Sequence, residues 1–390
     1  MRCSGIDSPR SPATMTPHEP LLEILPGLPR LLRRDAWFRV VDAVADASAD
    51  EIERFDRALR AWWGAERNAY PTWWCTTERV GEGPWTEGHD VFRGFVEPTE
   101  RAFRLARQLV LEAPEGIDET TLSSLAGLPW LVGISALVLN AQRSPRLAAA
   151  IASFARDPRT AHVREYELEL SGLELDRVLA VLDSLPPSLE RLVVHGVRDP
   201  RFAAELASRL ASRPSLVRLG LFGIPLGREG LAALATSGAF DRLDALSLYE
   251  VGLDDEAARA WSLRAPSSRL RVLELGERNE ALGAPMHGPG LVALADAGWL
   301  DGLESLVLAR HALVGDVFRH VLARADLARL DGLLLADLPF GEGDLERLRH
   351  AGERLPALAC LRLVRTSLGE ERERWLERLA LPPRFRLLDP

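Results

Sequence analysis

The clearest pattern in this chain is an apolar motif, L-x-x-L-x-L-x-x-L-x-L, that occurs twice between residues 216 and 253. The two copies are 27 residues apart, and their apolar positions are Leu216, Leu219, Leu221, Ile224 and Leu226, then Leu243, Leu246, Leu248, Val251 and Leu253. Alternating apolar positions predict a short strand whose leucines point inward, followed by a turn and a helix that returns the chain.

The same motif recurs along most of the chain at intervals of 26 to 29 residues, with one interval of 33. Its first positions are Ile134, Val163, Leu189, Leu216, Leu243, Leu270, Leu303, Leu330 and Leu358. Helix-like segments such as 230–236 separate the motifs, and residues 105–125 form a degenerate first unit with Val110 and Leu111 in its strand. No single unit can enclose its own leucines, so neighbouring units must stack. The predicted fold is an α/β solenoid, a horseshoe with parallel strands on its concave face and helices on its convex face.

Three segments of different character are expected along the chain. Residues 1–20 are rich in Pro and Ser and are expected to form a disordered tail. Residues 21–98 are expected to be a helical, Trp-rich N-terminal cap region, in which residues 48–51 have the form of a capping box. Residues 99–390 form the repeat domain, with about nine repeats plus partial units at its ends. The aromatic side chains of 68–97 either cover the exposed end of the first repeat, which we favour, or form a recognition surface.

The register of the motif predicts which side chains line the concave face. Three aromatic side chains fall at the same position of successive units: His195, Phe222 and Tyr249. The charged residues around this row are Arg218, Glu250 and Glu274. An exposed aromatic row with charges around it is typical of a protein-binding hot spot. The alternative is that the rings pack on one another or on the N-terminal segment.

One predicted strand near the start of the repeats carries alternating carboxylates, Glu165, Glu167 and Glu169. A paired-carboxylate acid/base site or a calcium site is conceivable for such a pattern. No second cluster completes either kind of site, so we favour a solvated acidic strand or a docking patch for a basic partner.

The interval of 33 residues contains a six-residue insertion within 276–290, a range that includes Met286 and His287. Loops that follow strands often carry binding function. A tolerated surface insertion explains the extra residues equally well.

Composition excludes several classes of protein and site. The formal net charge of -9 and the pI near 5.5 argue against nucleic acid or an anionic membrane as the main partner. No apolar run is long enough to span a membrane, and the first 20 residues lack the apolar region of a secretory signal, so the cytoplasm is the expected compartment. All 48 basic residues are arginine, which codon bias in a GC-rich genome explains more simply than escape from lysine modification.

Candidate chemistry is sparse. The three cysteines, Cys3, Cys75 and Cys360, have neither disulfide-framework nor metal-ligand spacing. The sequence contains no nucleophile elbow, phosphate loop or dinucleotide fingerprint. We therefore expect no catalytic residues, no metal and no cofactor.

The repeat closely resembles leucine-rich repeat proteins of the ribonuclease-inhibitor-like type, over about residues 100–390. Residues 92–97 (FRGFVE), an Ala/Leu-rich segment and then Leu109-Val-Leu-Glu-Ala-Pro resemble the lead-in of a bacterial subfamily that carries a small helical repeat-companion domain. The usual Tyr-Ala-Asp-Trp-Leu-type helix of that domain has no counterpart here. The resemblance implies a non-enzymatic protein-binding scaffold.

Three functional hypotheses follow. The first is a scaffold that binds a protein or peptide on its concave face, possibly as a subunit of a larger complex. The second is a sensor or regulatory repeat domain coupled to an N-terminal effector module. The third, by resemblance to other long-unit repeat proteins, is regulation of a small GTPase.

Overall fold

The computed structural model of this 390-residue chain describes residues 136–338 with gaps at 142–143, 265, 278–284 and 314, and short segments elsewhere within 47–55, 76–80, 108–111, 122–127 and 355–364. The expected N-terminal tail and most of the expected cap region lie outside the described residues. The chain divides into two compact units, one of residues 1–110 and 129–134, the other of residues 111–128 and 135–390.

The described part of the first unit contains the predicted capping box and one strand, β1 (Thr76–Val80). The Glu51 carboxylate accepts a hydrogen bond from the Ser48 amide at 2.8 Å, and the Glu51 amide donates to the Ser48 hydroxyl at 3.3 Å. These reciprocal bonds satisfy two backbone donors that the first turn of a helix leaves without partners. The capping box is therefore confirmed. A further strand, β2 (Gln108–Leu111), contains Val110 and Leu111, as predicted for the degenerate first unit.

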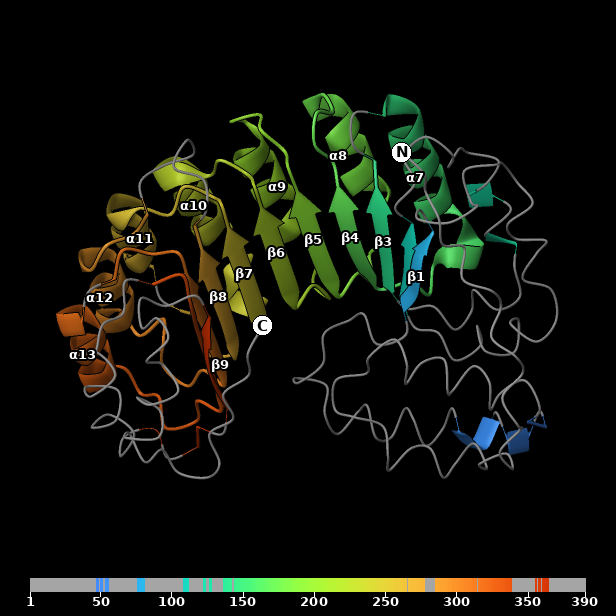
Figure 1. The fold of residues 1–390 in the computed structure, drawn as a ribbon. Coiled ribbons are helices and arrows are strands. Elements are labelled where there is room, and N and C mark those ends of the chain that lie inside the picture. The colour runs from blue at the N-terminus through green and yellow to red at the C-terminus, as the bar shows by residue number, and fades with distance from the viewer. Residues whose placement is uncertain are drawn as a thin grey trace, which may run out of the picture. The chain divides into compact units, whose positions relative to one another are not determined.

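The second unit is built from parallel strands that pair in chain order (Figure 1). They are β3 (Ala136–Asn140), β4 (Glu165–Glu169), β5 (Arg191–His195), β6 (Arg218–Phe222), β7 (Ala245–Tyr249), β8 (Val272–Gly276), β9 (Ser305–Ala309), β10 (Gly332–Ala336) and β11 (Cys360–Val364). The register aligns equivalent repeat positions from β3 to β11, and inward leucines such as Leu219, Leu246 and Leu273 are buried. The predicted register is confirmed.

One helix follows each strand from β3 to β9, and these helices cover one face of the sheet (Figure 1). They are α7 (Pro145–Arg156), α8 (Leu175–Ser184), α9 (Phe202–Ala211), α10 (Gly227–Thr236), α11 (Asp255–Ser262), α12 (Pro289–Asp296) and α13 (Gly315–Arg324), with short 3-10 turns η5 (Pro158–Thr160) and η6 (Phe240–Arg242). We call the opposite face of the sheet the strand face. This is the predicted α/β solenoid.

Local signals fix where two of these helices begin. The Ser144 hydroxyl accepts a hydrogen bond from the Leu147 amide at the start of α7, where Pro145 occupies the first turn. The Asp254 carboxylate does the same for the Ala257 amide at the start of α11. Both arrangements satisfy orphaned amides, and proline at the first turn sacrifices no hydrogen bond.

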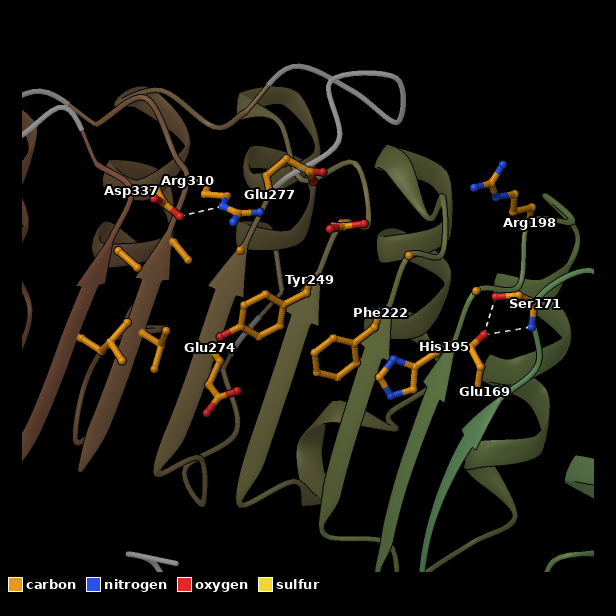
Figure 2. A pocket seen from close by; sticks show the side chains of 18 of the residues that line it. Glu169, Ser171, His195, Arg198, Phe222, Tyr249, Glu274, Glu277, Arg310 and Asp337 are labelled. Carbon is orange, nitrogen blue, oxygen red and sulfur yellow. Dashed lines mark hydrogen bonds and ion pairs between the residues drawn. The ribbon is translucent and has the colours of Figure 1, made fainter. Parts of the chain in front are cut away.

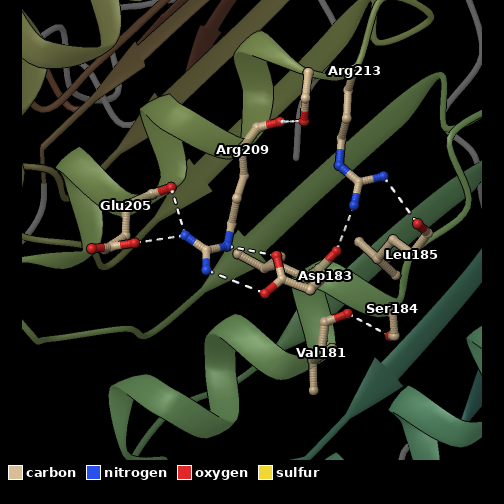
Figure 3. A network of polar contacts seen from close by, with 9 residues as sticks. Val181, Asp183, Ser184, Leu185, Glu205, Arg209 and Arg213 are labelled. Carbon is tan, nitrogen blue, oxygen red and sulfur yellow. Dashed lines mark hydrogen bonds and ion pairs between the residues drawn. The ribbon is translucent and has the colours of Figure 1, made fainter.

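On the helix side of the sheet, arginine side chains form hydrogen bonds between successive units (Figure 3). The Arg213 side chain is buried, and its guanidinium donates at 2.6, 3.1 and 2.9 Å to three main-chain carbonyls of the preceding unit: Leu182, Leu185 and Pro186. Arg242 donates to the Leu210 carbonyl at 2.9 Å in the next unit. The carbonyls of Leu182, Pro186 and Leu210 each also accept a main-chain hydrogen bond, so the arginines give these buried acceptors a second, charged donor.

A histidine occupies one of the apolar positions of the core. His311 is 1% exposed and lies 27 residues from Leu338, at the repeat position that Ile224 and Val251 hold in other units. A hydrogen bond with the main chain of Leu275 acts against the effect of burial on the ring but does not offset it. Burial therefore lowers the pKa of His311 to about 4, and the imidazole is neutral in the folded protein.

Replacing Arg213 with methionine is expected to lower the free energy of unfolding by about 2 to 4 kcal/mol, because three buried carbonyls each lose a charged hydrogen-bond donor. Denaturant titration of the full chain measures this. The matched control is Arg209→Met, which removes ion pairs to Asp183 and Glu205 whose carboxylates are about half exposed. That change is expected to cost less than about 1 kcal/mol. Equal losses for the two variants would contradict the role given to Arg213.

The pKa of His311 predicts acid sensitivity. The unfolded chain takes up a proton near pH 6.5 while the folded protein does so only near pH 4. The unfolded state therefore binds more protons between these values, and stability is lost as the pH falls through this window. His311→Leu is expected to raise stability and to flatten its decline between pH 7 and pH 4. Denaturation at several pH values tests this, with His287→Gln, whose ring is 56% exposed, as the control. An unchanged slope in His311→Leu would show that the ring is not buried as described.

Candidate functional site

The three predicted aromatic side chains form a continuous stack on the strand face (Figure 2). The ring centroids of His195 and Phe222 are 4.6 Å apart, and those of Phe222 and Tyr249 are 5.0 Å apart with planes 4° from parallel. Neighbouring strands are separated by about 4.8 Å, so aromatic residues in register meet at stacking distance. The rings pack on one another, which was one of the two expectations. All three residues remain partly exposed.

The stack ends at β8 because the next position in register is Gly276. A Cβ atom added there would lie 2.3 Å from Cδ1 of Tyr249, so the ring occupies space that any other side chain would need. Phe222 covers one face of the Tyr249 ring. The side of the ring away from Phe222 lies over Gly276 and is directed towards β9, where the next residue in register is Ala309.

The acidic strand β4 is engaged with its neighbour β5. The Glu167 carboxylate lies 3.4 Å from the Arg191 guanidinium and 3.3 Å from Nε2 of His195, and Glu165 lies 3.9 Å from the same guanidinium. Burial acts to raise the pKa of Glu167, but the hydrogen bond from His195 and the charge of Arg191 outweigh it, so the pKa lies below its ordinary value. Glu169 accepts hydrogen bonds from the amide and the hydroxyl of Ser171. These carboxylates are paired within the protein.

Glu274 stands in a different environment. Its carboxylate accepts a hydrogen bond from the Ser247 hydroxyl at 2.8 Å. Burial raises the pKa of Glu274 above its ordinary value, and the hydrogen bond from Ser247 and the charge of Arg191 do not offset it. Burial also raises the pKa of Tyr249, with the negative charge of Glu274 adding to the effect. The carboxylate and the ring thus lie close enough to influence each other.

The residue after five of the strands, β5, β6, β7, β9 and β10, adopts a left-handed backbone conformation at the edge of the strand face. Glycine takes this position after β5 and β6, but Glu250, Arg310 and Asp337 take it after β7, β9 and β10, with φ of 54°, 59° and 51°. The Glu250 amide donates to the Gly276 carbonyl at 2.8 Å, so this conformation continues the hydrogen-bonded ladder. A residue with a Cβ atom costs roughly 1 to 2 kcal/mol here. Despite this cost, the conformation places charged side chains at the edge of the sheet. Arg310 and Asp337 form an ion pair there at 2.7 Å.

These features border one groove, of about 820 Å³, that crosses the strands from β4 to β10 (Figure 2). Six of the predicted partner-binding residues line it: Glu169, His195, Phe222, Tyr249, Glu250 and Glu274. Glu167 and Arg218 lie on neighbouring strand positions but are not among its lining residues. Sequence reasoning missed four charged lining residues, Arg198, Glu277, Arg310 and Asp337. Three of these directly follow a strand, as Glu250 does, so extending the register by one residue would have found them.

The two residues assigned to the insertion have different environments. Met286 is fully buried and lies 27 residues before Leu313, another buried residue, so it is a core position of the repeat. The expectation that Met286 belongs to a binding loop is therefore corrected. His287 is exposed, and its amide donates to the Asp255 carboxylate at 3.1 Å. Residues 278–284, between β8 and Met286, lie outside the described residues.

The described part of the chain contains neither a membrane-spanning helix nor a metal-binding cluster. No helix there is long and apolar enough to cross a membrane. No group of three or more His, Cys, Asp or Glu side chains there could hold a metal ion.

No protein-family model and no curated protein sequence matches this chain. Solved structures resemble it at low identity. A chain of the yeast Rad7–Elc1 complex is 12% identical, with 90% of each chain covered and a TM-score of 0.50. The leucine-rich repeat-containing protein LegL7 from Legionella pneumophila is 13% identical, with 64% of this chain and 90% of that chain covered and a TM-score of 0.40. A Bacteroides fragilis protein is 14% identical, with 73% of each chain covered and a TM-score of 0.40. Such likeness concerns the fold alone. The repeating leucine register, together with the likeness to the chain of the Rad7–Elc1 complex, fits an α/β leucine-rich repeat solenoid.

Proposed function

We propose that this protein is a non-enzymatic scaffold that holds a protein or peptide in the groove on its strand face. The observation that carries the proposal is the partly exposed stack of His195, Phe222 and Tyr249 at the floor of that groove. Aromatic side chains in a concave, partly desolvated surface are the residues most often found to dominate binding energies.

The stack suits binding because its side chains are ordered before a partner arrives. Each ring is held against a ring on the adjacent strand, so little rotamer freedom remains to be lost on association. The sheet beneath is also rigid, since β4 to β9 each pair with a strand on both sides. A partner therefore meets side chains rather than an open strand edge, and recognition depends on shape, apolar contact and charge.

The Glu167–His195 pair does not favour an acid/base function over binding. Glu167 contacts both His195 and Arg191. The hydrogen bond from His195 and the charge of Arg191 keep the Glu167 carboxylate ionised. Their geometry explains how one end of the aromatic stack is held in place. We assign the pair a positioning role at the end of the groove.

The remaining expectations stand as proposals. We infer from residues 92–97 that the chain is related to bacterial repeat proteins with a companion domain, and that it acts in the cytoplasm as a subunit of a larger complex. An N-terminal effector module within 21–98 and regulation of a small GTPase remain alternatives. No contact of the described residues favours either.

The double variant Phe222→Ala with Tyr249→Ala is expected to weaken a bound partner by about 2 kcal/mol or more, roughly 30-fold in Kd, because it removes the apolar floor of the groove. The partner is first identified by affinity purification from the native cell and mass spectrometry, then purified and titrated by calorimetry. The control is Leu263→Ala, which removes a side chain 84% exposed outside the groove and should leave the affinity unchanged. An undiminished affinity in a folded double variant would rule out this face.

A further inference from the structure

Small residues follow the Tyr249 ring along the groove. Phe222 covers one face of that ring, and the ring itself lies over Gly276 on β8, where an added Cβ atom would be 2.3 Å from Cδ1. The next two residues in register are Ala309 on β9 and Ala336 on β10, both small and both lining the groove. The side of the ring away from Phe222, which we call its free face, is therefore directed past Gly276 towards these two alanines. We call the space over Ala309 and Ala336, beyond the Tyr249 ring, the slot.

A carboxylate borders the slot. Glu274 lies two residues before Gly276 on β8, on the same face of the strand. Its register partners are Ser247 on β7 and Val307 on β9, and Leu334 follows Val307 on β10. Both aliphatic side chains line the groove, so the surroundings of the carboxylate are largely apolar apart from Ser247. A carboxylate in such surroundings is poorly solvated, and a cation that arrives there interacts with it strongly.

No cation of the described chain neutralises Glu274. The groove-lining Arg310 is paired with Asp337, and Arg191 is paired with Glu165 and Glu167 on β4. Glu274 itself forms no ion pair with the described residues, and its hydrogen-bond partner is a neutral hydroxyl. By contrast, the chemically identical group of Glu167, at the same strand position in β4, already has two partners. The two glutamates therefore differ in what they can still bind.

An aromatic face beside a carboxylate is the arrangement that recognises a planar cation. A guanidinium group stacks on an aromatic ring and forms directed hydrogen bonds to a carboxylate, whereas a lysine ammonium does not stack in this way. We propose that the slot receives an arginine side chain of the bound polypeptide, with its guanidinium against the free face of Tyr249 and paired with the carboxylate of Glu274. This inference rests on the proposed function, since the arginine belongs to the partner held in the groove.

The shape and charge of the groove fit an extended basic segment. Its lining runs over seven successive strands, about 29 Å at the usual strand spacing, which an extended peptide of about nine residues spans. Its charged lining residues are five carboxylates and two guanidinium groups: Glu169, Glu250, Glu274, Glu277 and Asp337, with Arg198 and Arg310. This excess of negative charge favours the approach of a positively charged segment.

The test is selection of a displayed library of random linear nonapeptides against the full-length protein, followed by affinity measurement with synthetic peptides. Enriched peptides are expected to carry arginine at one fixed position. Replacing that arginine with citrulline, which keeps the shape and removes the charge, should weaken binding at least about tenfold, and lysine should bind less well than arginine. Glu274→Gln should cause a similar loss, and citrulline should cost little more in that variant because both changes remove one interaction.

Glu256→Gln is the control, because it neutralises an exposed glutamate on α11, outside the groove, and should leave peptide affinity within about twofold. Peptides that bind the Phe222→Ala, Tyr249→Ala variant more weakly but show no preference for arginine would overturn the proposal that the slot receives an arginine. The proposed function would then still stand. Peptides that keep their arginine preference in Glu274→Gln would also overturn the proposal for the slot. If no peptide is enriched and the native partner binds the Phe222→Ala, Tyr249→Ala variant unchanged, both proposals fail.

Discussion

Every feature of this protein depends on one constraint: a single repeat cannot bury its own leucines. Inward residues such as Leu219 and Leu246 are out of water only because the next unit lies against them. Stacking in turn buries backbone carbonyls at the ends of helices, and Arg213 satisfies three of them from the following unit. Hydrophobic burial and hydrogen bonding between units therefore act at the same junctions. Stability is distributed along the stack, and each unit is as stable as its contacts with its neighbours allow.

The same stacking creates the strand face. Parallel pairing without a change of register places residues 27 apart in sequence about one strand spacing apart in space. For Phe222 and Tyr249 this spacing equals the distance at which aromatic rings stack, so the repeat period itself produces the row. Gly276 ends the row by the absence of a side chain, and the left-handed residues after the strands bring charges such as Glu250 and Arg310 to its edge. A surface with an aromatic row, a stretch of small residues and charged side chains at its edge thus arises from variation at two positions of one motif.

The carboxylates of the strand face differ in the partners that they have within the protein. Glu167 is held between Arg191 and His195 and serves the structure, whereas Glu274 has only a hydroxyl as its partner and keeps a raised pKa. The pKa values of carboxylates at the same strand position thus shift in opposite directions because their neighbours in the adjacent strand differ. His311 shows the reverse case, in which an ionisable group takes an apolar position of the core and is kept neutral by burial.

The spacing of leucines was enough to predict the strands, their register, the faces they present and the aromatic row, because these follow from a local period that every unit repeats. The capping box at Ser48 and Glu51 could also be predicted, since its partners are three residues apart. The pairing of Glu167 with Arg191, the burial of Met286 and the open side of Tyr249 could not. Each depends on side chains 24 or more residues apart in sequence, on their rotamers, and on which of them reaches a partner across the strands. Periodicity determines which residues become neighbours, and packing in three dimensions determines which of those neighbours interact.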